Sequence, residues 1–261
     1  MFSFAANISM LFTELPFPER FCAAREAGFR YIEVQFPYAY PPEEVAELLK
    51  DNGLSLVLFN LPAGDWAAGE RGLGADPARV EEFRAGLEQA VRYAKILHTP
   101  LLNCLAGKIN PKFDAAEHRR TLLGNLGYAA DFLLPHKLCL TVENVNGFDV
   151  PGFFLQRTDM ILEAINEINR PNVRLQYDIY HAQRSEGEIV NTLRNNLEWI
   201  GHIQVADNPG RGWPGSGEIN YRFVFAELEK VGYQGHIGLE YMPGPKAGDT
   251  AASLKNFDWR S

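Results

Sequence analysis

The chain has 261 residues, enough for one large α/β domain or two small ones. Its 46% hydrophobic and 22% charged residues are typical of a globular protein with a sizeable core. The formal net charge of −8 argues against a nucleic-acid-binding surface, which normally carries a basic patch. A small anionic substrate stays open, because a metal ion or a single arginine can reverse the sign of the field locally.

Cysteine usage and the N-terminus bear on the compartment. The three cysteines, Cys22, Cys104 and Cys139, form no CxxC pair, and their odd number fits no closed disulfide framework, so we expect buried thiols in a reducing compartment. The N-terminus lacks a basic segment followed by a long apolar one, and no run approaches the roughly 18 apolar residues of a membrane span. We expect a cytoplasmic protein without a membrane segment. The sequence does not determine the oligomeric state, and a homo-oligomer is possible.

Apolar, β-rich runs alternate with helical patterns along the chain. The expected strands are residues 2–8, 30–36, 54–60, 100–105, 138–143, 173–178, 201–206 and 236–240. The expected helices are residues 16–28, 42–52, 78–97, 114–134, 158–168, 189–199 and 221–231, with one further helical piece after Gly244. Eight alternations without a shift in composition predict an α/β fold, a single (β/α)8 TIM barrel over residues 1–261. A doubly wound open sheet is the alternative, but no GxGxxG follows the first strand.

One segment interrupts this alternation. Residues 61–77, LPAGDWAAGERGLGADP, contain four glycines and two prolines, and a loop of this length inside a compact domain is usually functional or disordered. Trp66 and the pair Glu70 and Arg71 favour a lid or a substrate-binding loop, with Glu70 as a candidate contact to the substrate. The alternative is a surface excursion in which Trp66 packs as an anchor.

Groups that can bind a metal stand at the ends of the last four predicted strands: Glu143, Asp178, Gln204 and Glu240. In a TIM barrel the active site lies at the carboxyl ends of the strands, and neighbouring strands are about 4.8 Å apart, so these side chains can converge. Converging carboxylates repel one another unless they are protonated or bridged by a cation. Ligation by oxygen alone suits a hard divalent ion such as Mg²⁺ or Mn²⁺. The alternative is a satisfied polar layer or ion-pair network inside the barrel.

The remaining polar candidates carry weaker signals. His181 follows Asp178 in QYDIYH and is a candidate donor to the substrate. Arg211, in a loop rich in glycine and proline, could bind a carboxylate bidentately. An ordinary loop histidine and a solvated arginine would also explain these two residues. Three other histidines look like ordinary surface or helix-end residues: His98, His118 and His136.

Several runs of the chain resemble one known family. These runs are ANISMLFTELPF, FNLPAGDWAAGERG, VENVNGFDVPGF, QYDIYHAQR, GHIQVADNPGR, PGSGEINY and GLEY, and they extend from about residue 3 to 243. They are similar to the hydroxypyruvate isomerase family, which belongs to the xylose-isomerase-like barrels. The resemblance implies a TIM barrel with one divalent metal ion, Mg²⁺ or Mn²⁺, in which Glu143 and Glu240 act as proton donor and acceptor.

The same resemblance extends to the other candidates. It implies that Asp178 and Gln204 are further metal ligands and that His181 and Arg211 contact the substrate. Asn144 follows the first glutamate where many relatives have proline, and we expect this difference to alter loop rigidity more than chemistry.

The implied reaction moves a proton between two adjacent carbons of a small α-hydroxy carbonyl compound through an enediolate. Hydroxypyruvate, which gives tartronate semialdehyde, is the favoured substrate, and the C4 homologue 2-oxo-tetronate is the alternative. Two other classes compete. A non-catalytic sugar-acid binding protein is disfavoured because all four candidate ligands are present. An enzyme of the endonuclease IV type would need a histidine-rich zinc cluster and a basic surface that faces DNA.

Overall fold

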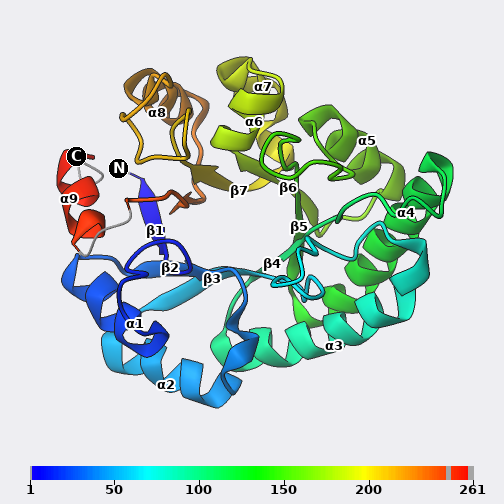
Figure 1. Ribbon diagram of the computed structural model, residues 1–261, viewed down its shortest axis with the longest axis horizontal. Coiled ribbons are helices and arrows are strands. Elements are labelled where there is room, and N and C mark those ends of the chain that lie inside the picture. Colours follow the sequence, from blue (N-terminus) through cyan, green and yellow to red (C-terminus); the bar gives the residue numbers. More distant parts are fainter. Residues whose placement is uncertain (1, 245–247, 258–261) are drawn as a thin grey trace.

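Eight parallel strands close into a barrel in the computed structural model, which describes residues 2–244 and 248–257 (Figure 1). Each strand pairs with its neighbours in chain order, and the last pairs with the first. All eight predicted strands are confirmed, and the doubly wound open sheet is excluded. The strands are β1 (Ser3–Asn7), β2 (Tyr31–Val34), β3 (Ser55–Asn60), β4 (Leu101–Cys104), β5 (Cys139–Glu143), β6 (Val173–Asp178), β7 (Ile200–Val205) and β8 (His236–Leu239).

Helices surround the barrel on its outer side, as Figure 1 shows. Helix α6 follows β6 directly, and the sequence pattern does not predict it. The helix expected at 189–199 becomes a 3₁₀ turn after Asn196, and the piece expected after Gly244 is α9. The helices are α1 (Phe17–Glu26), α2 (Pro42–Asn52), α3 (Val80–Leu97), α4 (Ala115–Leu133), α5 (Thr158–Ile168), α6 (Ile179–Ser185), α7 (Ile189–Asn196), α8 (Tyr221–Val231) and α9 (Asp249–Asn256).

Local sequence explains where several of these helices begin and end. At the start of α4, the Asp114 and Glu117 side chains each accept a hydrogen bond from the other residue's backbone N–H at 2.8 Å, a capping box. Gly53 ends α2 with a φ of +60°, a conformation that glycine adopts readily. Asp178 ends β6 and also caps α6, and this double position fixes its carboxylate at the mouth of the barrel.

The apolar core lies between the barrel and the helices. Because side chains alternate along a strand, residues such as Ile32, Leu140 and Ile203 face the helices and are fully buried. The opposite face of the strands points into the barrel and is largely polar. Buried polar groups require hydrogen-bond partners, so this interior constrains the side chains at the barrel mouth. Its members include Asn7, Glu33, Asn103, Thr141, Gln176 and His202.

The cysteines only partly match the expectation. Burial raises the pKa of Cys104 to about 12, so this thiol is an inert core group, as predicted. Cys139 is partly buried. Cys22 is exposed, and the prediction is wrong for this residue, because Phe21 and Ala24 form the buried face of α1 and Cys22 lies off that face.

His118 also departs from the expectation of a surface or helix-end residue. It is fully buried on α4, and its Nδ1 lies 2.7 Å from the carbonyl oxygen of Ala75. The position of His118 in a helix did not by itself reveal that the long loop before α3 packs over this face of α4. Among the described residues, no helix is both long enough and apolar enough to cross a membrane.

Candidate active site

A pocket opens at the carboxyl ends of the strands. Its cavity volume is about 100 Å³. Asp178 and Glu70 do not line the pocket themselves. Asp178 accepts a hydrogen bond from Arg211, which does line it. The predicted site residues that line the pocket are Glu143, His181, Gln204, Arg211 and Glu240.

Glu143 and Glu240 are buried acids with raised pKa values. Burial raises the pKa of Glu143 well above its usual range, and the negative charges of Glu240 and Asp178 add to the shift. Burial raises the pKa of Glu240 to about 7, with Arg211 opposing the shift and Asp178 adding to it. A carboxyl group with a pKa of about 7, as at Glu240, can take and return protons near neutral pH.

The two acids have different hydrogen-bond partners. Glu143 Oε2 accepts a hydrogen bond from Gln176 Nε2 at 2.5 Å. Glu240 Oε1 accepts one from Gln35 Nε2 at 2.6 Å, and its Oε2 accepts one from Arg211 Nη2 at 3.0 Å. A neutral amide therefore faces one carboxyl group and a guanidinium faces the other. This inequality is what paired acid and base roles require.

Arg211 places a positive charge among the carboxylates. Its Nη2 donates to Asp178 Oδ2 at 3.1 Å as well as to Glu240, and its Nε donates to the Glu240 carbonyl oxygen at 3.2 Å. Burial by itself would lower the pKa of Arg211, but Glu240, Asp178 and Glu143 raise it above its usual value. The residue has a φ of +56°, so its loop holds a strained backbone conformation that aims the side chain into the pocket.

His181 is a neutral imidazole with one tautomer favoured. Burial lowers its pKa to about 4. Asn146 Oδ1 accepts hydrogen bonds from the backbone N–H groups of Phe148 and Asp149, which fixes the orientation of its amide. Asn146 Nδ2 therefore donates to His181 Nδ1 at 2.7 Å, and the ring proton remains on Nε2. Arg211 Nη1, itself a donor, lies 3.2 Å from His181 Nε2, so this nitrogen can donate to another group only after Arg211 moves away.

Gln204 joins the site to a polar network inside the barrel. Its Oε1 accepts from Gln176 Nε2 at 2.8 Å, and its Nε2 donates to Glu33 Oε2 at 2.8 Å. Glu33 in turn pairs with His202 at 2.5 Å and accepts from Asn7 Nδ2 at 3.2 Å. The polar layer considered as an alternative to a metal site is therefore present, and it continues into the predicted ligands.

Because Gly238 has no side chain, the Glu33 carboxylate can occupy the space beside it. A Cβ at position 238 would lie 1.9 Å from Glu33 Oε1. We expect Gly238→Ala to lower the free energy of unfolding by about 1–3 kcal/mol through overpacking, measured by urea denaturation. Gly124→Ala on α4 is the matched control, because a Cβ there meets nothing within 4 Å and should be neutral or slightly stabilising. Equal effects of the two substitutions would contradict this account of the barrel interior.

The long loop at residues 61–77 contributes Trp66 and Arg71 to the pocket. Glu70 has a different position from that expected of a substrate contact. Its Oε1 accepts from Arg79 Nη1 at 2.5 Å, and its Oε2 accepts from the backbone N–H of Asp65 at 2.6 Å. Glu70 thus joins the two sides of the loop and stabilises its shape.

A model of the xylose isomerase-like TIM barrel family matches residues 21–257. The chain belongs to that family. Hydroxypyruvate isomerase of Escherichia coli strain K12 is 48% identical over 243 residues, which are 93% of this chain and 94% of the relative. 2-Oxo-tetronate isomerase of Pectobacterium atrosepticum is 43% identical over 246 residues, 94% of each chain. This family member is an isomerase, as these relatives are.

Solved structures share the xylose isomerase-like fold. A protein from Brucella melitensis, described as AP endonuclease, family 2, superposes with a TM-score of 0.93 at 40% identity, over 98% of this chain and 99% of the other. D-allulose 3-epimerase of a Methylomonas species superposes with a TM-score of 0.77 over 97% of this chain and 90% of the other. At 20% identity, the second comparison supports the fold alone.

The predicted metal ligands lie close together at the mouth of this xylose isomerase-like barrel, and the Arg211 side chain lies between two of them. In the part of the chain that the structure describes, no group of three or more His, Cys, Asp or Glu side chains is arranged to hold a metal ion. The Arg211 guanidinium bridges Asp178 and Glu240 and supplies positive charge between them. The donor chemistry nevertheless fits a hard ion, since the group consists of three carboxylates and an amide oxygen.

Polar residues that hydrogen-bond to the predicted acids and ligands were not among the sequence-based candidates; they include Glu33, Gln35 and Gln176. A signal for the first two exists in the run YIEVQF, where Glu33 and Gln35 stand at alternate positions, so Gln35, directly after β2, continues the inward face on which Glu33 lies. Gln176 shares the inward face of β6 with Asp178 by the same rule. The alternation of polar residues supported the predicted site on the later strands, and the same pattern in YIEVQF would have added Glu33 and Gln35.

Proposed function

We propose that this isomerase interconverts small α-hydroxy keto acids and aldehydes, and that it converts hydroxypyruvate to 2-hydroxy-3-oxopropanoate, also called tartronate semialdehyde. The observation that carries the proposal is the pair of buried acids, Glu143 and Glu240, with raised pKa values in one small pocket. The 48% identity to a hydroxypyruvate isomerase supports this substrate.

The two acids match the proton transfers of the reaction. One carboxylate takes a proton from C3 of hydroxypyruvate, and the other carboxyl group gives one to C2. The hydroxyl proton on O3 moves to O2, so the net change is an exchange of the carbonyl and hydroxyl positions. Once Arg211 Nη1 withdraws from His181 Nε2, the neutral His181 would donate a hydrogen bond through Nε2 to a substrate oxygen as negative charge develops there.

We further propose that one Mg²⁺ or Mn²⁺ ion is bound by Glu143, Asp178, Gln204 and Glu240. Gln204 Oε1 accepts a single hydrogen bond among the described residues. Burial, and after it the charges of Glu240 and Asp178, raise the pKa of Glu143, and a cation would relieve the repulsion among these carboxylates. Binding requires Arg211 Nη2 to withdraw from Asp178 and Glu240. The bound ion would polarise the carbonyl group of the substrate and acidify the adjacent C–H.

Metal removal tests this part of the proposal. EDTA-treated protein should lose at least about 100-fold in kcat, because the ion would supply several kcal/mol of charge stabilisation, and Mg²⁺ or Mn²⁺ should restore it. Turnover is measured with hydroxypyruvate and with 2-oxo-tetronate in parallel. Full activity after EDTA treatment, with no metal in the protein by elemental analysis, would contradict metal dependence.

The same assay decides between the two substrates. The 43% identity to a 2-oxo-tetronate isomerase favours the C4 acid as a second candidate, and one extra carbon changes binding by only about 1–3 kcal/mol. A higher kcat/KM for 2-oxo-tetronate would assign the chain to that reaction. Turnover of neither acid by metal-loaded protein would favour a sugar-acid binding protein.

The name of the Brucella melitensis structure makes DNA cleavage a further candidate. The net charge of −8 disfavours DNA binding, and His181 is the one histidine that lines the pocket among the described residues. We expect no incision of a duplex that contains an abasic site. Incision at a rate comparable to keto-acid turnover would overturn the proposed isomerase function.

A further inference from the structure

Arg71 is a second cation in the pocket, and no carboxylate among the described residues forms an ion pair with it. The other cation, Arg211, forms ion pairs with Asp178 and Glu240. Arg71 forms no ion pair within the described residues, and its Nη1 donates to two backbone carbonyl groups, those of Trp66 at 3.0 Å and Glu70 at 2.6 Å. The N–H groups on Nε and Nη2 remain free of protein acceptors among the described residues.

The Arg71 side chain is held in place before any ligand arrives. Its guanidinium lies 4.1 Å from the ring centroid of Trp66, a cation–π contact. Trp66 packs against Phe36 with ring centroids 4.9 Å apart, and Phe36 follows β2 at the barrel mouth. Stacking together with the two carbonyl contacts leaves the Nε and Nη2 edge of the guanidinium as a prepared fork. An anion that binds there need not bear the full cost of ordering a long side chain.

The loop backbone around Arg71 is also tied to the barrel. Gly72 N donates to Ala63 O at 3.0 Å, and Ala75 N donates to Ala106 O at 2.8 Å, beyond the end of β4. Gly72 has a φ of +125°, and a Cβ there would lie 2.3 Å from the carbonyl oxygen of Leu105. Such close backbone contact makes the loop a fixed wall of the pocket at this point.

The chemistry of a keto acid requires such a cation. Its carboxylate lies directly beside the reacting carbonyl carbon, in a pocket that also contains the acids Glu143 and Glu240. Like charges at this range repel, so the anionic end needs a positive partner that those acids do not already occupy. Arg71 meets this requirement, and the fork of a guanidinium matches a carboxylate in two parallel hydrogen bonds.

We propose that Arg71 binds the substrate carboxylate through its Nε and Nη2 edge and thereby selects keto acids over uncharged ketoses with the same reacting carbons. This assignment rests on the proposed function, because it identifies the part of the pocket that receives the acid group. It also assigns the loop at residues 61–77 a direct role in specificity, through Arg71 and not through Glu70.

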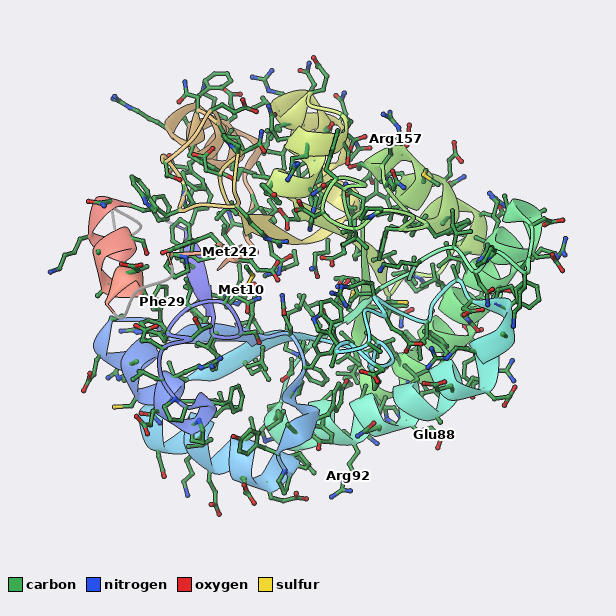
Figure 2. The ribbon with its side chains drawn as sticks, in the orientation of Figure 1. Met10, Phe29, Glu88, Arg92, Arg157 and Met242 are labelled. Atoms are coloured by element: carbon green, nitrogen blue, oxygen red, sulfur yellow. The ribbon has the colours of Figure 1, made fainter. Side chains whose placement is uncertain are left out.

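The test compares Arg71→Gln, Arg71→Lys and the control Arg92→Gln. Figure 2 shows Arg92 pointing outward from α3, so Arg92→Gln removes the same charge away from the pocket. The kcat/KM values are measured for hydroxypyruvate and for dihydroxyacetone, in which a CH₂OH group replaces the carboxylate. Arg71→Gln should lower kcat/KM for hydroxypyruvate by about 100-fold, mainly through KM, and for dihydroxyacetone by less than about threefold. Arg71→Lys should recover part of the loss, and Arg92→Gln should match the native protein.

Binding of D-glycerate and of glycerol, measured by calorimetry on the metal-loaded proteins, separates this inference from the proposed function. Arg71→Gln should weaken D-glycerate binding by a similar factor and leave glycerol unchanged. The native protein could isomerise neither keto acid and yet bind D-glycerate, with Arg71→Gln weakening that binding. In that case Arg71 is an anion site and the isomerase proposal fails. Equal losses for charged and uncharged ligands, no loss in either Arg71 variant, or no D-glycerate binding by the native protein would overturn the assignment.

Discussion

Glu143→Gln and Glu240→Gln are each expected to lower kcat for hydroxypyruvate by about 10²–10⁴-fold, the usual contribution of a positioned acid or base. Glutamine has nearly the same shape, and it can still accept the hydrogen bonds that Gln176 and Gln35 donate. The fold should therefore persist. What disappears is the capacity to take up and release a proton at these positions.

Two controls separate lost chemistry from lost structure. Glu88→Gln changes a glutamate that Figure 2 shows on the outer side of α3, and it should leave kcat unchanged. Circular dichroism and urea denaturation should show folded protein for both site variants. Near-normal turnover by both Glu143→Gln and Glu240→Gln would refute their assignment as the proton-transfer pair.

Hydrogen exchange in ²H₂O then assigns the two roles. The variant that keeps the proton-accepting carboxylate should still exchange the C3 hydrogen of hydroxypyruvate with solvent, although it forms little product. The variant that lacks this carboxylate should show no exchange. NMR of the recovered substrate distinguishes the two, and exchange in both variants would mean that another group removes the proton.

The contribution of Glu240 to the stability of the metal-free protein is expected to decrease as the pH rises from about 4.5 to 7. Glu240 has a pKa of about 7 in the folded state and an ordinary value of 4.5, so the folded state binds more protons than the unfolded state across this interval. The free energy of unfolding therefore falls with rising pH, by up to about 3 kcal/mol from this residue. The pKa of Glu143 shifts in the same direction. His181 acts in the opposite direction: burial lowers its pKa to about 4, so its contribution to stability increases between about pH 4 and 6.5.

Urea denaturation at several pH values checks this dependence. The difference in stability between Glu240→Gln and the native sequence should shift in favour of the variant as the pH rises from 4.5 to 7, by up to about 3 kcal/mol. Glu88→Gln should keep the native profile. Saturating Mg²⁺ or Mn²⁺ should stabilise the native protein most at high pH, because the ion binds the deprotonated carboxylates. An unchanged slope in Glu240→Gln would show that burial does not raise the pKa of this residue.

The sequence alone determined the barrel and the convergence of the main site. Eight apolar runs alternate with helical segments, and parallel strands in a closed barrel have a common carboxyl edge. Side-chain alternation places a residue on the inner or outer face without knowledge of the partner strand. These two local rules suffice to bring Glu143, Gln204 and Glu240 to one pocket.

Only the tertiary structure decided which groups pair across the barrel. Glu33 and His202 are 169 residues apart, and their contact depends on barrel closure and on register shifts in β2 and β6 that alternation does not encode. The loop conformations were also decided by the tertiary structure. They place Glu70 against Arg79, Arg71 in the lining of the pocket, and Arg211 between two carboxylates. The physical reason is that local pattern selects the face of an element, whereas long-range packing selects the partner.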